Sequence, residues 1–136
     1  MPTNDHEAIR QIIARQAQLR DDDRIDEWIS VWADDGVFIT GEQRHEGRAA
    51  VLALANSLTT GSWRALHLLS EPYIEVDGNT ATAETDLVIV APGADGRLNI
   101  RAANRYYDRF RRAADGRWLY TERRVETRRP KPRVAG

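Results

Sequence analysis

The sequence predicts an α+β fold in which three N-terminal helices pack on a strongly curved antiparallel sheet that encloses a pocket. Up to about residue 58, apolar side chains recur at helical spacing, and from Trp63 onward alternating segments are separated by turns. Each of these turns carries a glycine and joins neighbouring segments, so we expect an antiparallel meander. Helices on one face of such a curved sheet leave a pocket between the two layers.

Three helices are expected before residue 59. Apolar residues that recur with a period of roughly 3.6 residues predict the first helix over residues 5–20. The second is expected over Ile25–Ala33, with Asp23 as its N-cap and Gly36 just after its end, where glycine favours a helix stop. An Ala- and Leu-rich segment, Arg48–Leu58, predicts the third helix.

The strands are expected from alternation and from turn residues. Val37–Thr40 is predicted to be a short strand, followed by a polar loop over Gly41–Gly47. Arg64–Val76 is predicted to be one strand, in which Pro72 marks a bulge or an edge position. Asp77-Gly78-Asn79 is a strong hairpin signal. Three further strands are expected over residues 80–91, 97–113 and 118–127.

Length and composition favour one domain. The chain has 136 residues, of which 41% are hydrophobic, enough for a single core of ordinary size. We expect one domain over residues 1–127 and a flexible basic tail over residues 128–136, which contains two prolines.

Charge and cysteine content exclude several functional classes. Twenty basic residues face 21 acidic ones, a net charge of −1, which argues against nucleic acid as a partner. The absence of cysteine excludes disulfides, thiolate metal sites and cysteine nucleophiles. There is no apolar run of signal-peptide or membrane-span type, so the expectation is a soluble cytoplasmic protein that binds no membrane.

One segment, Asp21–Phe38 (DDDRIDEWISVWADDGVF), is the first candidate for catalytic side chains. Three adjacent carboxylates follow the end of the first helix and precede a strongly apolar stretch. A carboxylate beside a large apolar surface is a candidate for a partly desolvated acid or base. His67 is its candidate partner, because histidine suits proton transfer near neutral pH.

Four segments together resemble the SnoaL-like (polyketide cyclase-like) branch of the nuclear-transport-factor-2-like (NTF2-like) superfamily. They cover the chain from about residue 5 to 126 and read AIRQIIARQAQLRDDDRIDEWISVWADDGVF, EGRAAVLAL, HLLSEPYIEVDGNTATAETDLVIV and RYYDRFRRAADGRWLYTERRVE. The resemblance implies a cone-shaped fold whose pocket serves cyclases, isomerases, dehydratases, an epoxide hydrolase and a dehydrochlorinase. Because fold does not fix function, the reaction stays open at this point.

The resemblance also implies a position for two catalytic residues. Some members use an Asp at the end of helix one and a His at the start of the long strand, and Asp21 and His67 occupy these places. Other relatives have a Tyr where Gln16 stands, or a second pocket His near Tyr107, and this chain has neither. His67 would act as the base and Asp21 would orient it. The alternative is a buried His–Asp pair that only ties helix to sheet.

Further residues are expected at the pocket wall. By the resemblance, the strand face carrying Asn104 and Tyr106 looks into the cone, where Tyr106 could donate a hydrogen bond to a ligand oxygen. Trp28 and Trp63 would supply apolar wall. For all of these, plain core packing is the alternative. Arg105 lies on the opposite face, which relatives use for dimer contacts, so a homodimer through the sheet is implied.

These observations lead to one functional hypothesis and two alternatives. The first is a cofactor-independent enzyme without a metal site that abstracts a proton from a small apolar, oxygenated or ring-containing molecule. Isomerisation, cyclisation, dehydration and elimination all belong to this class. The second is a non-catalytic module for a small hydrophobic ligand or for dimerisation. The third is an accessory protein resembling the β subunit of ring-hydroxylating dioxygenases.

Overall fold

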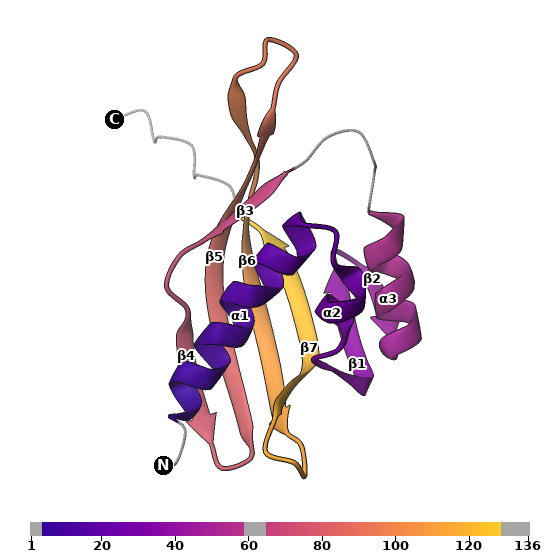
Figure 1. Cartoon of the computed structure of the whole chain (residues 1–136), viewed down its shortest axis with the longest axis vertical. Helices are drawn as coiled ribbons and strands as arrows, with labels where there is room; N and C mark the ends of the chain where they lie inside the picture. Colours follow the sequence, from indigo (N-terminus) through magenta and orange to yellow (C-terminus); the bar gives the residue numbers. More distant parts are fainter. Residues whose placement is uncertain (1–3, 59–64, 129–136) are drawn as a thin grey trace, which may run out of the picture.

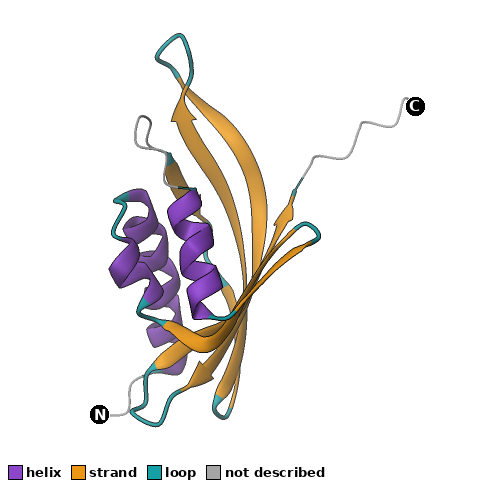
Figure 2. Cartoon of the chain, turned by 90° about the vertical axis from the view of Figure 1, so that its right-hand side faces the viewer, coloured by secondary structure: helices purple, strands orange, loops and turns teal. Residues whose placement is uncertain are grey.

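Three helices cover the concave side of a curved seven-stranded sheet (Figures 1 and 2). The computed structural model describes residues 4–58 and 65–128. The helices are α1 (Asp5–Asp21), α2 (Ile25–Ile29) and α3 (Arg48–Ser57). The strands are β1 (Trp32–Thr40), β2 (Gln43–Glu46), β3 (Leu66–Leu69), β4 (Tyr73–Asp77), β5 (Thr80–Pro92), β6 (Leu98–Arg112) and β7 (Trp118–Thr127). The predicted α+β class and helix-on-sheet architecture are confirmed.

The strands run in the order β2-β1-β7-β6-β5-β3, and β4 also pairs with β5. All pairs are antiparallel except β1 with β7, which is parallel. The prediction of a wholly antiparallel sheet was therefore wrong at this one pair. Hairpin turns fix the direction of neighbours such as β5 and β6, whereas β1 and β7 are joined by most of the chain and no local turn constrains them.

Helix α1 begins and ends close to its predicted limits. The Asn4 side chain accepts hydrogen bonds from the backbone N–H groups of His6 (2.9 Å) and Glu7 (3.4 Å), as expected of an N-cap. Ile9 and Ile13 are fully buried against the sheet. The buried face of α1 thus belongs to the core, which continues to Leu19 near the C-terminal end of the helix.

The second helix is shorter than predicted. It ends at Ile29, and Trp32 and Ala33 belong to β1 instead. Strand β7 competes for this segment, because the Tyr120 N–H donates to the Val31 carbonyl at 2.8 Å. The predicted cap, Asp23, has a positive φ of 58° and makes no cap, since Arg24 holds the N-cap position without a side-chain hydrogen bond.

Gly36 does not stop a helix but lies within β1. A Cβ atom at this position would lie 2.9 Å from Trp32 Cε3, so the residue needs to be glycine for close packing. The predicted polar loop after β1 contains strand β2, which pairs antiparallel with β1. Most side chains of β2 are exposed, as is typical of an edge strand, which explains why its sequence resembles a loop.

The expected strand over Arg64–Val76 is two strands. β3 and β4 both pair with β5, and the segment from Ser70 to Pro72 separates them. The Ser70 N–H donates to the Asp86 carbonyl at 2.8 Å, and Pro72 has no N–H to continue the ladder. Pro72 therefore lies between two strands and not at a bulge within one, so the prediction of a single strand was wrong.

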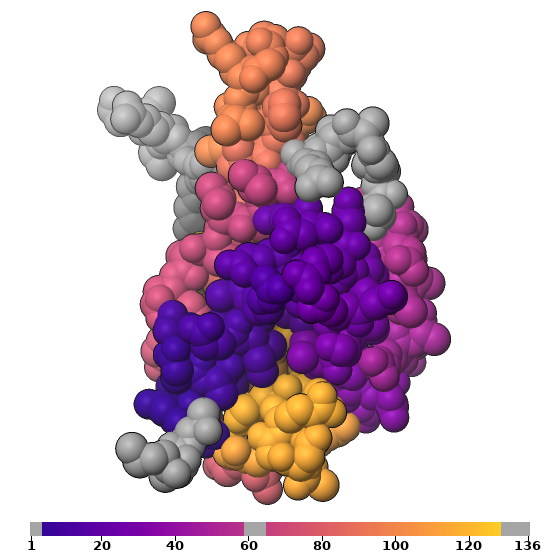
Figure 3. Space-filling model, viewed as in Figure 1, coloured from indigo at the N-terminus to yellow at the C-terminus, as the bar shows by residue number. Residues whose placement is uncertain are grey.

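The core lies between α1, α2 and the central strands. Aromatic rings stack at its centre, with Trp32 5.1 Å from Tyr120 and Phe110 4.5 Å from Tyr120 between ring centroids. The helices cover the middle of the sheet, and the β5–β6 hairpin projects beyond them (Figures 1 and 3). This arrangement leaves a cavity between α1, α3 and the inner face of the sheet.

Candidate functional site

A cavity of about 470 Å³ lies between α1, α3 and the inner face of the sheet. Its wall is predominantly apolar, with a few polar side chains that point inward from separate elements. The volume is typical of sites for small molecules. The described residues that line it are Ile13, Gln16, Ala17, Arg20, Trp28, Phe38, Thr40, Leu54, Ala55, Ser57, Leu58, Ala65, His67, Ile89, Asn104, Tyr106, Arg123 and Val125.

Asp21 and His67 meet at the edge of this cavity. His67 Nδ1 lies 2.6 Å from Asp21 Oδ1, and the two side chains are 17% and 11% exposed. The same carboxylate also accepts from the His67 backbone N–H, at 3.0 Å to Oδ2. Asp21 therefore holds both the ring and the backbone of β3. With Nδ1 engaged, Nε2 is the ring nitrogen left for the cavity that His67 lines.

The structure separates the three adjacent carboxylates. Asp21 ends α1 and reaches His67, whereas Asp22 is the C-cap residue of α1. Asp22 and Asp23 are both exposed. Asp21 is thus the acid of this segment that contacts a residue of the cavity wall.

Tyr106 and Asn104 of β6 both line the cavity. Burial raises the pKa of the Tyr106 phenol, and the neighbouring Arg123 opposes this effect. A phenol with a raised pKa stays protonated near neutral pH and can donate a hydrogen bond. Its position agrees with the face expected from the resemblance.

The tryptophans differ in what the structure shows. Trp28 is 4% exposed and lines the cavity, with its ring 5.4 Å from that of Trp32. It is therefore both core and wall. Trp63 lies outside the described residues.

A buried ion pair at the cavity wall was not expected from the sequence. Arg123 Nε and Nη2 donate to the two oxygens of Asp108, at 2.8 and 2.9 Å, and Nη2 also donates to the Tyr120 hydroxyl at 3.1 Å. The guanidinium carbon lies 3.8 Å from the centroid of the Tyr106 ring. Burial alone would lower the pKa of Arg123, but the Asp108 carboxylate outweighs it, so the pKa is raised and the side chain stays cationic.

Gln16 is a second polar residue of the wall that was not assigned a role. Its Nε2 donates to the Trp28 carbonyl at 2.9 Å, which fixes the orientation of the amide. Its Oε1 is buried and has no hydrogen-bond partner within the described part of the chain. Arg20, one turn later on α1, also lines the cavity.

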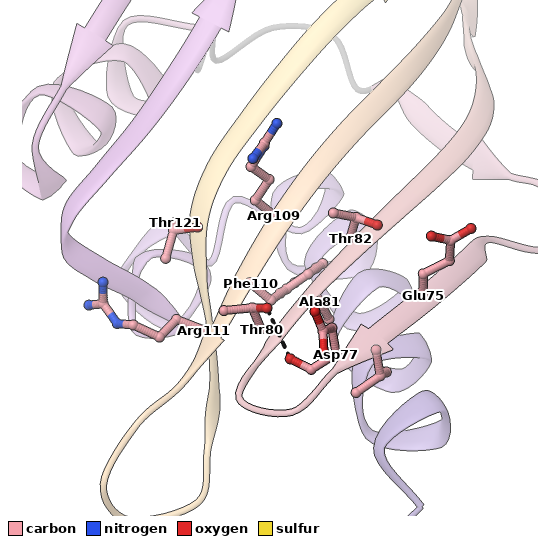
Figure 4. Close-up of a pocket in the computed structure, with 10 residues that line it drawn as sticks. Glu75, Asp77, Thr80, Ala81, Thr82, Arg109, Phe110, Arg111 and Thr121 are labelled. Atoms are coloured by element: carbon pink, nitrogen blue, oxygen red, sulfur yellow. Dashed lines mark hydrogen bonds between the residues drawn. The ribbon is translucent and has the colours of Figure 1, made fainter.

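A larger hollow of about 610 Å³ lies on the sheet near the β4–β5 turn (Figure 4). Arg109, Arg111, Thr80 and Thr82 line it, and all four are exposed. Polar groups in contact with solvent make few strong interactions with a ligand. We therefore place the candidate site at the smaller cavity, where the polar groups are buried.

The described residues contain neither a cluster of metal ligands nor a membrane-spanning helix. Over residues 4–58 and 65–128, no three His, Asp or Glu side chains gather as ligands for a metal ion. No helix in these same residues is long and apolar enough to cross a bilayer.

Comparisons with known proteins agree with this architecture. A structure of an NTF2-like protein with a cystatin-like fold from Novosphingobium aromaticivorans is 28% identical, with a TM-score of 0.78 over 89% of this chain and 80% of that one. A structure of a Catenulispora acidiphila protein in complex with S-DNPA is 25% identical. It has a TM-score of 0.79 and covers 90% of this chain and 92% of that one. The β subunit of a putative aromatic-ring-hydroxylating dioxygenase from N. aromaticivorans is 23% identical, with a TM-score of 0.77. The match covers 96% of this chain and 92% of that one, and at this identity it shows only that the two chains share a fold.

A search of curated protein sequences found no match to this chain. The comparison with protein families matches residues 2–124 to the SnoaL-like domain. Since the match covers nearly all of the described residues, the chain belongs to the SnoaL-like domain family.

Proposed function

We propose that this protein is a cofactor-independent enzyme of the lyase or isomerase type that abstracts a proton from a small, largely apolar, oxygenated or ring-containing molecule. The observation that carries the proposal is the 2.6 Å contact between Asp21 Oδ1 and His67 Nδ1 at the wall of an apolar cavity. A carboxylate on one ring nitrogen fixes the tautomer that leaves the other nitrogen as a base.

Four polar groups have a defined part in this reaction. His67 Nε2 takes a proton from carbon, and the Asp21 carboxylate stabilises the imidazolium that forms. Tyr106 donates a hydrogen bond to the carbonyl oxygen on which charge develops, and Asn104 is a second donor at the wall. Trp28 holds the apolar part of the substrate. A base near 3 Å from the reacting carbon and a donor on the oxygen are the minimum that enolisation needs.

Proton exchange at a carbon acid tests the proposal without the natural substrate. 2-Tetralone is a bicyclic ketone with activated α protons, and their exchange in D₂O can be followed by NMR. The wild-type protein is expected to accelerate exchange above the buffer rate, His67→Gln is expected to abolish the acceleration, and Asp21→Asn is expected to reduce it at least about tenfold.

His6→Gln is the matched control, because His6 is exposed in the first turn of α1, away from the cavity. It is expected to keep the wild-type rate. Far-UV circular dichroism checks that each variant is folded. A folded His67→Gln protein with wild-type exchange rejects His67 as the base.

The contact between Asp21 and His67 also weighs against the first alternative. A module that only binds a ligand has no need of a carboxylate on the His67 ring, whereas a base does, so the contact beside an open cavity favours the catalytic proposal. The accessory-subunit alternative requires a larger iron protein as partner. Its support is the likeness in fold to a dioxygenase β subunit, and fold does not fix function.

A further inference from the structure

We propose that Arg123 is the anion-binding group of the cavity and that the ligand is an apolar ring system bearing one oxyanion, either a carboxylate or an enolate. The proposal rests on the proposed function in so far as the cavity is the ligand site. It adds the chemical class of the ligand and a residue that the reaction scheme above does not use.

The geometry of Arg123 leaves one nitrogen unused. Nε and Nη2 form the two parallel bonds to Asp108, and Nη2 also reaches Tyr120. Nη1, on the other side of the guanidinium, has no acceptor among the described residues. Because Arg123 lines the cavity, Nη1 is the guanidinium nitrogen that remains to donate to a ligand atom there.

The side chain is also fixed in place. Arg123 is 4% exposed, and its guanidinium carbon lies 3.8 Å from the Tyr106 ring centroid and 4.9 Å from that of Tyr120. The carboxylate of Asp108 holds the guanidinium at a fixed angle. Because the donor is held before a ligand arrives, little side-chain entropy is lost on binding.

The charges around the cavity favour an anion. Its charged lining residues are Arg20 and Arg123, with His67 as a third titratable group, and none of the described lining residues is Asp or Glu. Asp21 and Asp108 lie behind His67 and Arg123 rather than at the wall. Hydrogen bonds to a charged group in an apolar cavity are roughly twice as strong as neutral ones.

The oxyanion can come from two sources. It is either a carboxylate that the ligand already carries or an enolate formed when His67 removes an α proton. In both cases Arg123 Nη1 and the Tyr106 hydroxyl donate hydrogen bonds to the oxyanion. Both groups belong to the sheet side of the cavity.

Binding of matched aromatic probes tests the first source. 2-Naphthoate and 2-naphthamide have the same ring system and nearly the same shape, but only the first carries a charge. Dissociation constants from titration calorimetry are expected to favour 2-naphthoate by at least about tenfold in the wild-type protein. Arg123→Lys keeps the charge but loses the planar fork, and is expected to reduce this preference.

Asp108→Asn combined with Arg123→Met removes both charges without leaving either one buried alone, and is expected to abolish the preference. Arg105→Lys, on the outer face of the sheet, is the control and is expected to retain it. Melting temperatures establish that each variant is folded.

The exchange of 2-tetralone protons tests the second source. One outcome is that the wild-type protein binds 2-naphthoate and 2-naphthamide equally well, but the folded double variant exchanges the protons of 2-tetralone more slowly than wild type. The oxyanion is then the enolate. If neither the preference nor the exchange rate depends on Arg123, the proposal is overturned. A preference for 2-naphthoate in a protein that exchanges no protons supports the anion site and rejects the proposed catalysis, so the two failures are distinguishable.

Discussion

Two arginine–aspartate pairs with the same hydrogen-bond pattern lie in opposite environments. The side chains alone of Arg123 and Asp108 are 5% and 0% exposed, whereas those of Arg105 and Asp86 are 26% and 51% exposed. In each pair the arginine Nε and Nη2 donate to the two carboxylate oxygens. The chain therefore provides an internal comparison of what burial does to one interaction.

Removing the buried carboxylate is expected to be far more damaging than removing the exposed one. Asp108→Ala leaves the Arg123 cation buried without a counter-charge, which lowers the free energy of unfolding by about 3–5 kcal/mol. Asp86→Ala breaks a solvent-screened pair and lowers it by about 1 kcal/mol or less. Urea unfolding monitored by tryptophan fluorescence measures both, and equal losses would contradict the buried character of the Arg123–Asp108 pair.

The sequence predicted the placement of some residues of the candidate site and missed that of others for a physical reason. Asp21 and His67 were placed by resemblance to a family pattern, and they do meet. Arg123 was missed because β7 contains an irregularity. Tyr120 pairs with Phe110 while Glu122 pairs with Arg109, so one extra residue shifts the alternation of faces. Strict alternation from Trp118 and Tyr120 would turn Glu122 inward, and the bulge turns Arg123 inward instead.

One signal could have pointed to this pair. Asp108 shares the inward face of β6 with Asn104 and Tyr106, and it is 1% exposed. A carboxylate on a strand face that is otherwise buried requires a cation nearby. The identity of that cation depends on the register between β6 and β7, which no local pattern specifies.

At the scale of elements, α1 is tied to the sheet at both ends. Near its C-terminus Asp21 bonds to His67 of β3. At its N-terminus Asp5 accepts from Arg112 Nη2 of β6 at 2.7 Å and from Trp118 Nε1 of β7 at 3.3 Å. The hydrogen bond from Arg112 lowers the pKa of the Asp5 carboxyl, with burial opposing the effect.

This tie gives stability a defined pH dependence. A carboxyl whose pKa is lower in the folded state stabilises the fold above its unfolded pKa of about 3.9. The contribution is lost as the pH falls through the folded value. Asp5→Asn is therefore expected to unfold more easily than wild type at pH 7, and the difference is expected to shrink steadily below pH 4. Chemical unfolding at several pH values measures it.

Glu42→Gln is the matched control, because Glu42 lies exposed in the β1–β2 turn. It removes one negative charge without breaking a tie to another element. A difference between Asp5→Asn and wild type that does not change with pH would show that the Asp5 charge contributes nothing.

Elements with strong local signals were predicted best. The long periodic helix α1 and the strands joined by glycine turns agree with their predicted positions within about two residues. The errors lie where pairing between distant strands decides the secondary structure. Pairing with β7 makes residues 32 and 33 part of β1, and the exposed side chains of β2 give its sequence the character of a loop. Apolar spacing at Trp28, Ile29 and Trp32 fits a helix as well as it fits the observed helix–strand boundary.

At the scale of the whole molecule, the outer face of the sheet carries exposed apolar side chains. Leu66 and Ile100 flank Val90 across three strands, and they are 48% and 69% exposed. Leu68, two residues along β3, is 54% exposed. An exposed apolar group of this kind on a sheet is typical of a surface that associates with another chain.

We therefore expect a homodimer through the outer sheet face. Sedimentation equilibrium is expected to give about twice the monomer mass of 15.5 kDa. Leu68→Glu places a charge in this face and is expected to shift the protein toward monomer, because a buried unpaired charge opposes association. Ala14→Glu, on the exposed side of α1, should leave the mass unchanged. A wild-type monomer at high concentration contradicts this prediction.

The parallel contact between β1 and β7 has a consequence for how the chain reaches this structure. These strands are neighbours in the sheet, but the segment between them contains α3 and five other strands. Synthesis proceeds from the N-terminus, so the hydrogen-bonding groups on one side of β1 wait until the last strand has been made. During that interval a newly made chain presents an unpaired strand edge, to which strands of other chains can bind. Slow translation or crowding should therefore favour aggregation over folding.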